Sequence, residues 1–168
     1  MSVRRAVPGD LRELLAVAER AFRETFEATN DPGDMEAYCE EAFAETLWAA
    51  ELEDPACTFL VGGDPRIQGY VKVREATAPA CVDGPDPLEL ERIYVVAEAL
   101  GSGLGSALLQ AALDHARSLG RRTIWLGVWE ENHRALAFYA KNGFTAVGAK
   151  TFVLGSDVQT DRVLARPL

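Results

Sequence analysis

Two periodicities of apolar residues along the chain predict its helices and strands. Helical spacing is clearest near the N-terminus, where it is carried by Leu11, Leu14, Leu15, Ala18, Ala21 and Phe22. The turn sequence Asn-Asp-Pro-Gly at 30–33 ends this helix, and a second helix is expected to begin at Asp34. Further helices are expected at 47–52, 105–119 and 132–142. Short β-type runs predict strands at 2–7, 58–62, 69–74, 88–96, 122–128, 144–154 and 162–165.

The order of these elements is β, helices, β, β, β, α, β, α, β, β. It predicts an α/β (α+β) fold, with a mixed sheet that carries helices on its faces. The 168 residues contain no repeats and no low-complexity linker, and 48% of them are apolar. We therefore expect one compact domain with a proper core.

The most informative segment is 88–109, with the sequence LELERIYVVAEALGSGLGSALL. A β-type run leads into Gly101, Gly103 and Gly105 and then directly into an apolar helix. Glycines let the backbone turn tightly and approach a ligand closely. The start of the helix adds unpaired N–H groups and the positive end of its dipole. This order predicts a site that binds a phosphate-bearing ligand through backbone amides.

Two familiar nucleotide motifs do not fit this glycine loop. A Walker A loop needs Lys followed by Ser or Thr after its last glycine, but Gly105 is followed by Ser106 and Ala107. The dinucleotide motif spaces its glycines as G-x-G-x-x-G near a first strand, whereas these glycines alternate in mid-chain. We therefore expect a phosphate ligand of another class.

Charge is distributed unevenly along the chain, whose net charge is −9. Residues 24–64 contain twelve Asp or Glu and no Lys or Arg. An acidic chain does not favour nucleic-acid backbones, so no nucleic-acid partner is expected. The acidic segment either attracts a cationic ligand or consists of solvated helix faces.

The pattern of cysteines and histidines predicts no metal site, and the hydropathy of the chain predicts no membrane-spanning segment. Three cysteines and two histidines show no ligand spacing, so no metal site is expected. No apolar run approaches the roughly 20 residues of a membrane span, and the N-terminus lacks the apolar segment of a secretory signal. We expect a cytoplasmic chain with reduced thiols.

Three motifs, in order, resemble the GNAT superfamily of acetyl-CoA-dependent N-acetyltransferases. They are ERIYVVAEALGSGLGSALL at 91–109, WLGVWEEN at 125–132 and RALAFYAKNGF at 134–144. The resemblance spans residues 2–167 and is strongest over 88–145. It implies an acyl-CoA N-acyltransferase fold, with a mostly antiparallel sheet of six or seven strands flanked by helices. It also implies a single N-acetyltransferase domain at 1–168, with an acceptor-side half at 1–87 and an acetyl-CoA-binding and catalytic half at 88–168.

By this resemblance the co-substrate is acetyl-CoA. Backbone groups of Ile93, Tyr94 and Val95 would hold the pantetheine arm as an added strand would. The remaining cofactor-binding residues implied are Leu100, Gly101, Ser102, Gly103, Leu104, Gly105, Ser106, Asn132, Ala135, Phe138 and Tyr139. The family usually has Gln or Arg where this chain has Leu100, so we expect weaker CoA affinity, carried almost wholly by backbone amides.

Acetyl transfer needs a neutral amine, donors for the developing oxyanion and a proton for the leaving thiolate. Tyr139 matches the family's general acid, although a core aromatic at helical spacing would look the same. Glu89 and Glu91 share one strand face, and by resemblance one of them acts as the base. Glu91 is slightly favoured because it is nearer the cofactor, and the alternative is a pair of solvated carboxylates.

Within the family the chain is similar to the PaiA-type spermine/spermidine acetyltransferases, through WLGVWEENHRALAFYAKNGF and the tail KTFVLGSDVQTDRVLARPL. This similarity and the acidic segment favour a polyamine or another small cationic amine as the acceptor, acetylated by direct attack in a ternary complex. Two alternatives stay open: acetylation of a protein or peptide N-terminus or lysine, and a non-catalytic acyl-CoA-binding regulatory domain. A homodimer is also compatible with the family.

Overall fold

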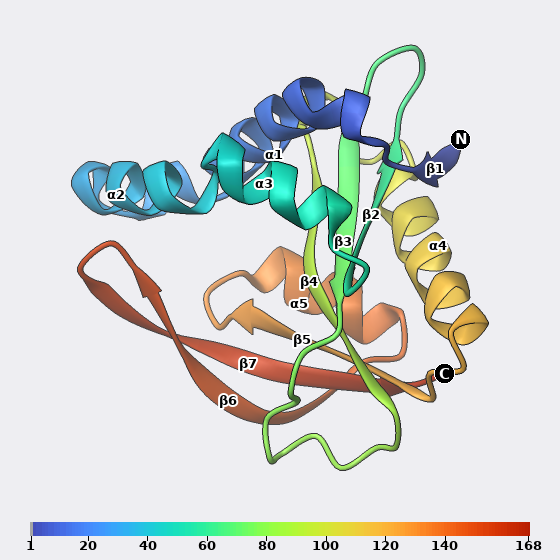
Figure 1. Ribbon diagram of the computed structural model, residues 1–168. Helices are drawn as coiled ribbons and strands as arrows, with labels where there is room; N and C mark the ends of the chain where they lie inside the picture. Colours follow the sequence, from blue (N-terminus) through green and yellow to red (C-terminus); the bar gives the residue numbers. More distant parts are fainter. Residues whose placement is uncertain (1) are drawn as a thin grey trace.

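The computed structural model describes residues 2–168 and arranges them around one seven-stranded sheet (Figure 1). The strands are β1 (Val3–Arg5), β2 (Cys57–Gly62), β3 (Gly69–Arg74), β4 (Pro87–Val95), β5 (Thr123–Trp129), β6 (Thr145–Leu154) and β7 (Asp157–Pro167). The α-helices are α1 (Leu11–Phe26), α2 (Pro32–Ala42), α3 (Glu45–Glu53), α4 (Leu104–Ser118) and α5 (His133–Lys141). Short 3-10 turns are η1 (Pro8–Asp10), η2 (Glu27–Thr29) and η3 (Ala97–Ala99).

The strand order is β1-β2-β3-β4-β5-β7-β6, and every neighbouring pair is antiparallel except β4 and β5. The predicted mostly antiparallel sheet flanked by helices is therefore confirmed. All seven predicted strands are present, although β7 begins at Asp157 instead of 162. Its first residues are polar and pair with β6 as one arm of a hairpin, so apolar alternation did not mark them.

Helix α2 also begins earlier than predicted, at Pro32 instead of Asp34. The side chain of Asp31 accepts a hydrogen bond from the Asp34 N–H at 3.0 Å and so caps the helix. Proline fits the first helical position because its missing N–H would be unpaired there in any case. The turn sequence at 30–33 therefore both ends the preceding segment and starts the next helix.

Helices cover both faces of the sheet and enclose two apolar cores. Helices α4 and α5 pack on one face, where the buried side chains include Val71, Leu90, Leu108 and Leu126. Helices α1, α2 and α3 pack on the other face, over a core rich in aromatic residues that includes Phe22, Trp48, Phe59 and Tyr70. Among residues 2–168, no helix is long and apolar enough to cross a membrane.

The parallel pair β4 and β5 stays together only at its start. Pro87–Glu89 pairs with Thr123–Trp125, and the two strands then diverge. Strand β4 also carries a bulge, because Lys72 lies opposite Arg92 and Val73 lies opposite Leu90, which leaves Glu91 as an extra residue. A bulge bends and twists its strand. The bulge therefore lies where β4 turns away from β5 and opens the sheet.

Candidate active site

Two cavities lie where β4 leaves β5, and they share Ile93, Tyr94, Asn132, Ala135 and Tyr139. The first, which we call the loop cavity, has a volume of about 610 Å³ and lies beside the glycine loop. The second, which we call the sheet cavity, has a volume of about 400 Å³ and lies under α1 and α2. A molecule bound in one cavity can thus meet a molecule bound in the other at β4 and α5.

The loop cavity brings together most of the predicted cofactor-binding residues. Those that line it are Ile93, Tyr94, Val95, Leu100, Gly101, Gly103, Gly105, Ser106, Asn132, Ala135, Phe138 and Tyr139. Gly101 and Gly103 have φ angles of +79° and +92°, which glycine adopts without the strain that a Cβ brings. These angles turn the chain from η3 into α4 and direct the start of the helix at the cavity.

The backbone amides of the loop divide into two groups. The N–H of Ser102 donates to the Ala99 carbonyl, and the N–H of Leu104 donates to the Ser102 hydroxyl. For Gly101, Gly103, Gly105 and Ser106, the residues described here provide no acceptor for the N–H. These same four residues line the cavity, whereas Ser102 and Leu104 do not. Unpaired amides at a helix N-terminus favour an anion, and we refer to these four N–H groups as the anion site.

Ser102 and Leu104, which the sequence also predicted to bind the cofactor, lie outside the lining of this cavity. The Ser102 hydroxyl donates to the Ala99 carbonyl at 2.6 Å and holds the turn together. The Leu104 side chain is buried in the core. Leu100, in contrast, lines the loop cavity with 44% of its surface exposed, so it places an apolar side chain beside the anion site.

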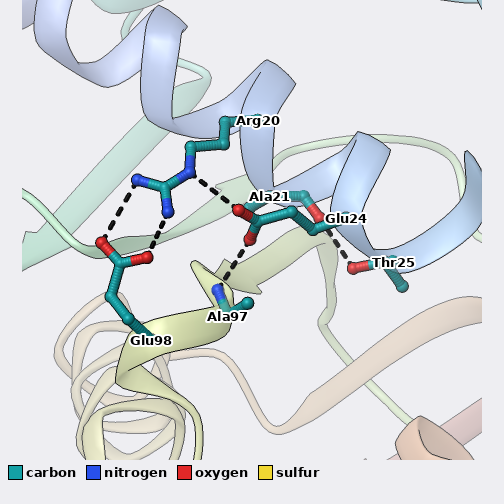
Figure 2. A network of polar contacts seen from close by, with 6 residues as sticks. All are labelled: Arg20, Ala21, Glu24, Thr25, Ala97 and Glu98. Carbon is teal, nitrogen blue, oxygen red and sulfur yellow. Dashed lines mark hydrogen bonds and ion pairs between the residues drawn. The ribbon is translucent and has the colours of Figure 1, made fainter.

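A polar network ties helix α1 to the turn that precedes the glycine loop (Figure 2). The Glu24 carboxylate accepts hydrogen bonds from the Arg20 Nε and from the Ala97 N–H, both at 2.7 Å. Arg20 also pairs with Glu98 on η3. Because Glu24 lines the loop cavity, these two donors partly offset its negative charge near the anion site. The network fixes η3 against α1, and the glycine loop follows directly from η3.

The divergent edge of β4 presents unpaired backbone groups to the loop cavity. On its other edge β4 pairs with β3, and the Val96 N–H donates to the Gln68 carbonyl at 2.9 Å. In an antiparallel ladder successive residues turn their peptide groups to opposite sides. The groups of Tyr94 therefore point to β3, and those of Ile93 and Val95 point to the gap that β5 has left.

Helix α5 places Asn132 and Tyr139 between the two cavities. The Asn132 side chain accepts the Ala135 N–H at 3.3 Å and caps the helix. Tyr139 is buried against Phe138 and Phe144, with T-shaped ring contacts of 5.5 Å to each. Burial raises the pKa of its hydroxyl above the ordinary value of 10. The phenol is thus protonated at neutral pH and reaches the point where the cavities meet.

Glu89 and Glu91 both line the sheet cavity, as expected for residues on one strand face, but their surroundings differ. Glu91 pairs with the ammonium of Lys72, a side chain only 3% exposed that also pairs with Glu51. Glu89 is 9% exposed and has no ion pair or hydrogen bond within residues 2–168. Burial, followed by the nearby Glu91, raises the pKa of Glu89 above its ordinary value.

Aromatic side chains form much of the wall of the sheet cavity. They come from α1 and α2 on one side and from β4, β5 and β6 on the other, and are Phe22, Phe26, Tyr38, Tyr94, Trp129 and Phe152. None of the twelve carboxylates between Glu24 and Asp64 lines this cavity. The apolar faces of α1 and α2 turn inward instead. The acidic segment therefore does not surround the sheet cavity.

Several residues of the two cavities were not identified from the sequence. Arg134 lines the loop cavity, and Arg74, Arg92, Lys150 and Asp161 line the sheet cavity. Asp161 is 7% exposed, and burial raises the pKa of its carboxyl. The positive charge of Lys150 partly opposes this rise. The sequence carried no signal for the sheet-cavity charges, because they come from strands that meet only in the folded sheet.

Comparison with known proteins places this arrangement in a family. Residues 14–144 match the acetyltransferase (GNAT) family. The chain is 36% identical over 160 residues to an uncharacterized N-acetyltransferase encoded in the pepI 3' region of Lactobacillus delbrueckii subsp. lactis. That match covers 95% of this chain and 92% of the relative.

Solved structures show the same fold at lower sequence identity. The PaiA N-acetyltransferase of Thermoplasma acidophilum, determined in complex with coenzyme A, superposes with a TM-score of 0.81 at 20% identity, over 99% of this chain and 98% of that one. The ribosomal-protein-S18-alanine N-acetyltransferase of Escherichia coli superposes with a TM-score of 0.73 at 18% identity, over 99% and 92%.

Proposed function

Since this chain belongs to the acetyltransferase (GNAT) family and is an N-acetyltransferase, we propose that it joins acetyl-CoA in the loop cavity to a primary amine in the sheet cavity. This proposal rests on one observation: the loop residues whose N–H groups lack an acceptor are the same loop residues that line the loop cavity. Four N–H groups that lack acceptors within residues 2–168, at Gly101, Gly103, Gly105 and Ser106, all face one cavity large enough for an extended ligand.

The donor is held mainly through the backbone. The four amides bind the pyrophosphate of CoA, as helix N-termini bind phosphates generally. The Ile93 carbonyl and the peptide groups of Val95 pair with the amides of the pantetheine arm and so continue the sheet where β5 has diverged. Arg134 adds one cation to this cavity. The thioester then lies beside Tyr139, at the boundary between the cavities.

The transfer is a direct one. The ammonium group of the acceptor gives one proton to Glu89, and the neutral amine attacks the thioester carbonyl carbon, so that a C–N bond forms. The C–S bond then breaks as the tetrahedral intermediate collapses, and the nitrogen releases its second proton to water. The Ile93 N–H on the divergent edge of β4 stabilises the negative charge on the carbonyl oxygen, while the Ile93 carbonyl and the peptide groups of Val95 hold the pantetheine arm. Tyr139 gives its proton to the departing CoA thiolate and is then reprotonated from water. No cysteine among residues 2–168 lines either cavity, which favours direct attack over an acetylated thiol.

Glu89 is the better candidate for the base, although Glu91 is nearer the cofactor along the strand. Glu91 is held in an ion pair with the buried Lys72, so its carboxylate is already engaged within the protein. Glu89 lacks such a partner within residues 2–168, and its pKa is raised toward the range in which a carboxylate accepts a proton effectively. We propose Glu89 as base and Glu91 as part of the structure that supports the bulge.

A small amine fits this site better than a protein chain does. The sheet cavity has a volume of about 400 Å³ and is walled by aromatic residues from α1, α2 and β6, dimensions typical of a small-molecule site. The carboxylates of Glu89 and Asp161 attract an ammonium group. A polyamine is one such acceptor, but its support from the sequence is weaker because the acidic segment lies elsewhere.

The proposal is tested by measuring CoA thiol release from acetyl-CoA with a panel of acceptors. The panel contains polyamines, amino acids, aminoglycosides and a peptide that starts with alanine. We expect turnover with at least one small amine and little with the peptide. Binding of CoA without turnover of any amine would instead support a regulatory acyl-CoA-binding domain, and turnover of the peptide alone would support a protein acceptor.

A further inference from the structure

Arg92 is a cation of the sheet cavity to which residues 2–168 offer no carboxylate. It lies on β4 directly after the bulge at Glu91. One of its terminal nitrogens donates to the Tyr38 hydroxyl at 2.9 Å, and the guanidinium carbon lies 5.2 Å from the centre of the Phe43 ring. Across the described part of the chain, no Asp or Glu oxygen lies within 4 Å of its nitrogens.

The other cations of this cavity are accompanied by negative charge. Arg74 lies 3.9 Å from the Glu91 carboxylate. Lys150 is close enough to Glu89 and Asp161 to oppose the rise that burial causes in the pKa of both carboxyls. Arg92 instead faces phenol groups and aromatic rings. The sheet cavity therefore has an end with two carboxylates and a lysine, and an end with one unbalanced arginine.

A guanidinium that is largely withdrawn from water is unfavourable unless an anion accompanies it. Arginine stays charged under all ordinary conditions, and its planar fork of N–H groups matches the two oxygens of a carboxylate. Tyr38 and Phe43 hold Arg92 in place, and its side chain makes no other hydrogen bond within residues 2–168. Along β4, Glu89 and Arg92 are three residues apart, at most roughly 10 Å, which is the scale of one small molecule.

We propose that the acceptor is a primary amine that also carries a carboxylate, and that Arg92 binds this carboxylate while the amine faces Glu89. The substrate class is that of free amino acids with an apolar or aromatic side chain, for which Phe22, Phe26 and Trp129 provide the wall. This inference rests on the proposed function, since it specifies the acceptor of the same reaction. Arg92 is then the residue that selects amino acids over simple amines.

The test compares acceptors that differ only in the carboxylate. L-phenylalanine is paired with L-phenylalaninamide and with 2-phenylethylamine, and L-ornithine is paired with putrescine; spermidine is included as well. Thiol release is followed at saturating acetyl-CoA. We expect kcat/KM to be at least tenfold higher for the carboxylate member of each pair, which is the effect of one charge-assisted interaction.

Variants locate the effect at Arg92. Arg92→Met is expected to lower kcat/KM for L-phenylalanine on the order of 10- to 100-fold, mainly through KM, and to leave 2-phenylethylamine nearly unchanged. Arg92→Lys keeps the charge without the fork and is expected to be intermediate. The control is Arg117→Met on α4, an exposed arginine paired with Asp114, which should behave as the unaltered enzyme. Circular dichroism and CoA binding verify that each variant is folded.

The outcomes separate the two proposals. Equal or better turnover of putrescine, spermidine or 2-phenylethylamine would overturn the inference about Arg92 and leave the acetyltransferase mechanism standing. If CoA binds but none of the amines supports thiol release, the mechanism is overturned as well. If Arg92→Met does not fold, the acceptor pairs with the unaltered enzyme and with Arg92→Lys still decide the question.

Discussion

Replacement of Gly103 by alanine tests whether the glycine loop is shaped for a ligand or only for the fold. Gly103 has a φ of +92° and Gly120 has a φ of +74°, and the two residues flank opposite ends of α4. An added Cβ would meet no atom within 4 Å at either position. The only penalty for Gly103→Ala and Gly120→Ala is therefore the left-handed backbone, about 1–2 kcal/mol of unfolding free energy in each.

The two substitutions should differ in their effect on CoA. To relieve the strain at its new alanine, the Gly103→Ala variant must rotate the amides of position 103 and its neighbours away from the loop cavity. A hydrogen bond to a charged group contributes about 1.5–3 kcal/mol, and each 1.4 kcal/mol is a factor of about ten in Kd. Loss of one such bond should raise the Kd for CoA about 10- to 100-fold in Gly103→Ala. Gly120→Ala, which is remote from the cavity, should bind CoA normally.

Gly105→Ala completes the comparison by separating ligand binding from stability. Gly105 lies in the first turn of α4, and an added Cβ would lie 4.0 Å from Phe138 and Val95, both of which line the loop cavity. Alanine favours the helix by about 0.5–1 kcal/mol, so this variant should be more stable and yet bind CoA more weakly. Urea denaturation and calorimetric titration measure both quantities. Equal CoA affinity in Gly103→Ala and Gly120→Ala, at equal loss of stability, would show that the backbone at Gly103 serves the fold and does not serve CoA binding.

Further predictions concern the acid, the base and the apolar residue beside the anion site. Tyr139→Phe should lower kcat tenfold or more, about 1.4 kcal/mol of barrier, without changing the Kd for CoA; an unchanged kcat would remove Tyr139 from the mechanism. The pH profile of kcat/KM should have an acidic limb above pH 4.5, because burial raises the pKa of Glu89, and this limb should disappear in Glu89→Gln but persist in Glu91→Gln. The reverse result would make Glu91 the base. Because the pKa of Glu89 is raised in the folded protein, the free energy of unfolding falls as pH rises from the pKa of Glu89 in the unfolded chain to its pKa in the folded protein. Glu89→Gln should therefore gain stability over the unaltered enzyme as pH rises from the ordinary carboxyl range to neutrality, measured by urea denaturation; a constant difference would contradict the burial of a charged Glu89. Leu100→Arg should lower the Kd for CoA severalfold by adding a cation at an exposed position, and an unchanged Kd would show that this side chain lies outside the phosphate site.

Much of the donor half of the site could be predicted because it depends on local sequence. The glycine loop, the strand before it and the helix after it are contiguous in 88–109, so their spacing alone indicates where unpaired amides gather. Tyr139 was identified through a short motif within one helix. The local sequence did not distinguish Ser102 and Leu104 from their neighbours, since only the folded turn shows that their N–H groups are already paired.

The acceptor half could not be predicted in the same way. The bulge at Glu91 depends on the register of β4 against β3, which no pattern within β4 alone defines. That bulge decides which side chains face the sheet cavity and brings Arg92 beside Tyr38. The acidic segment at 24–64 illustrates the same point, because its charge was visible in the sequence but the direction of its helix faces was not. Apolar residues such as Phe22 and Phe26 take the inward face, and the carboxylates are left outside the sheet cavity.

A crystal structure of the protein with bound CoA tests the proposed donor site directly. We predict that pyrophosphate oxygens lie at hydrogen-bonding distance, about 2.7–3.2 Å, from the nitrogens of Gly101, Gly103, Gly105 and Ser106. The pantetheine arm should pair with Ile93 and Val95, and the sulfur should lie beside the Tyr139 hydroxyl, facing the sheet cavity. A sulfur that points away from the sheet cavity, or a pyrophosphate bound outside the glycine loop, would show that the donor does not bind as proposed.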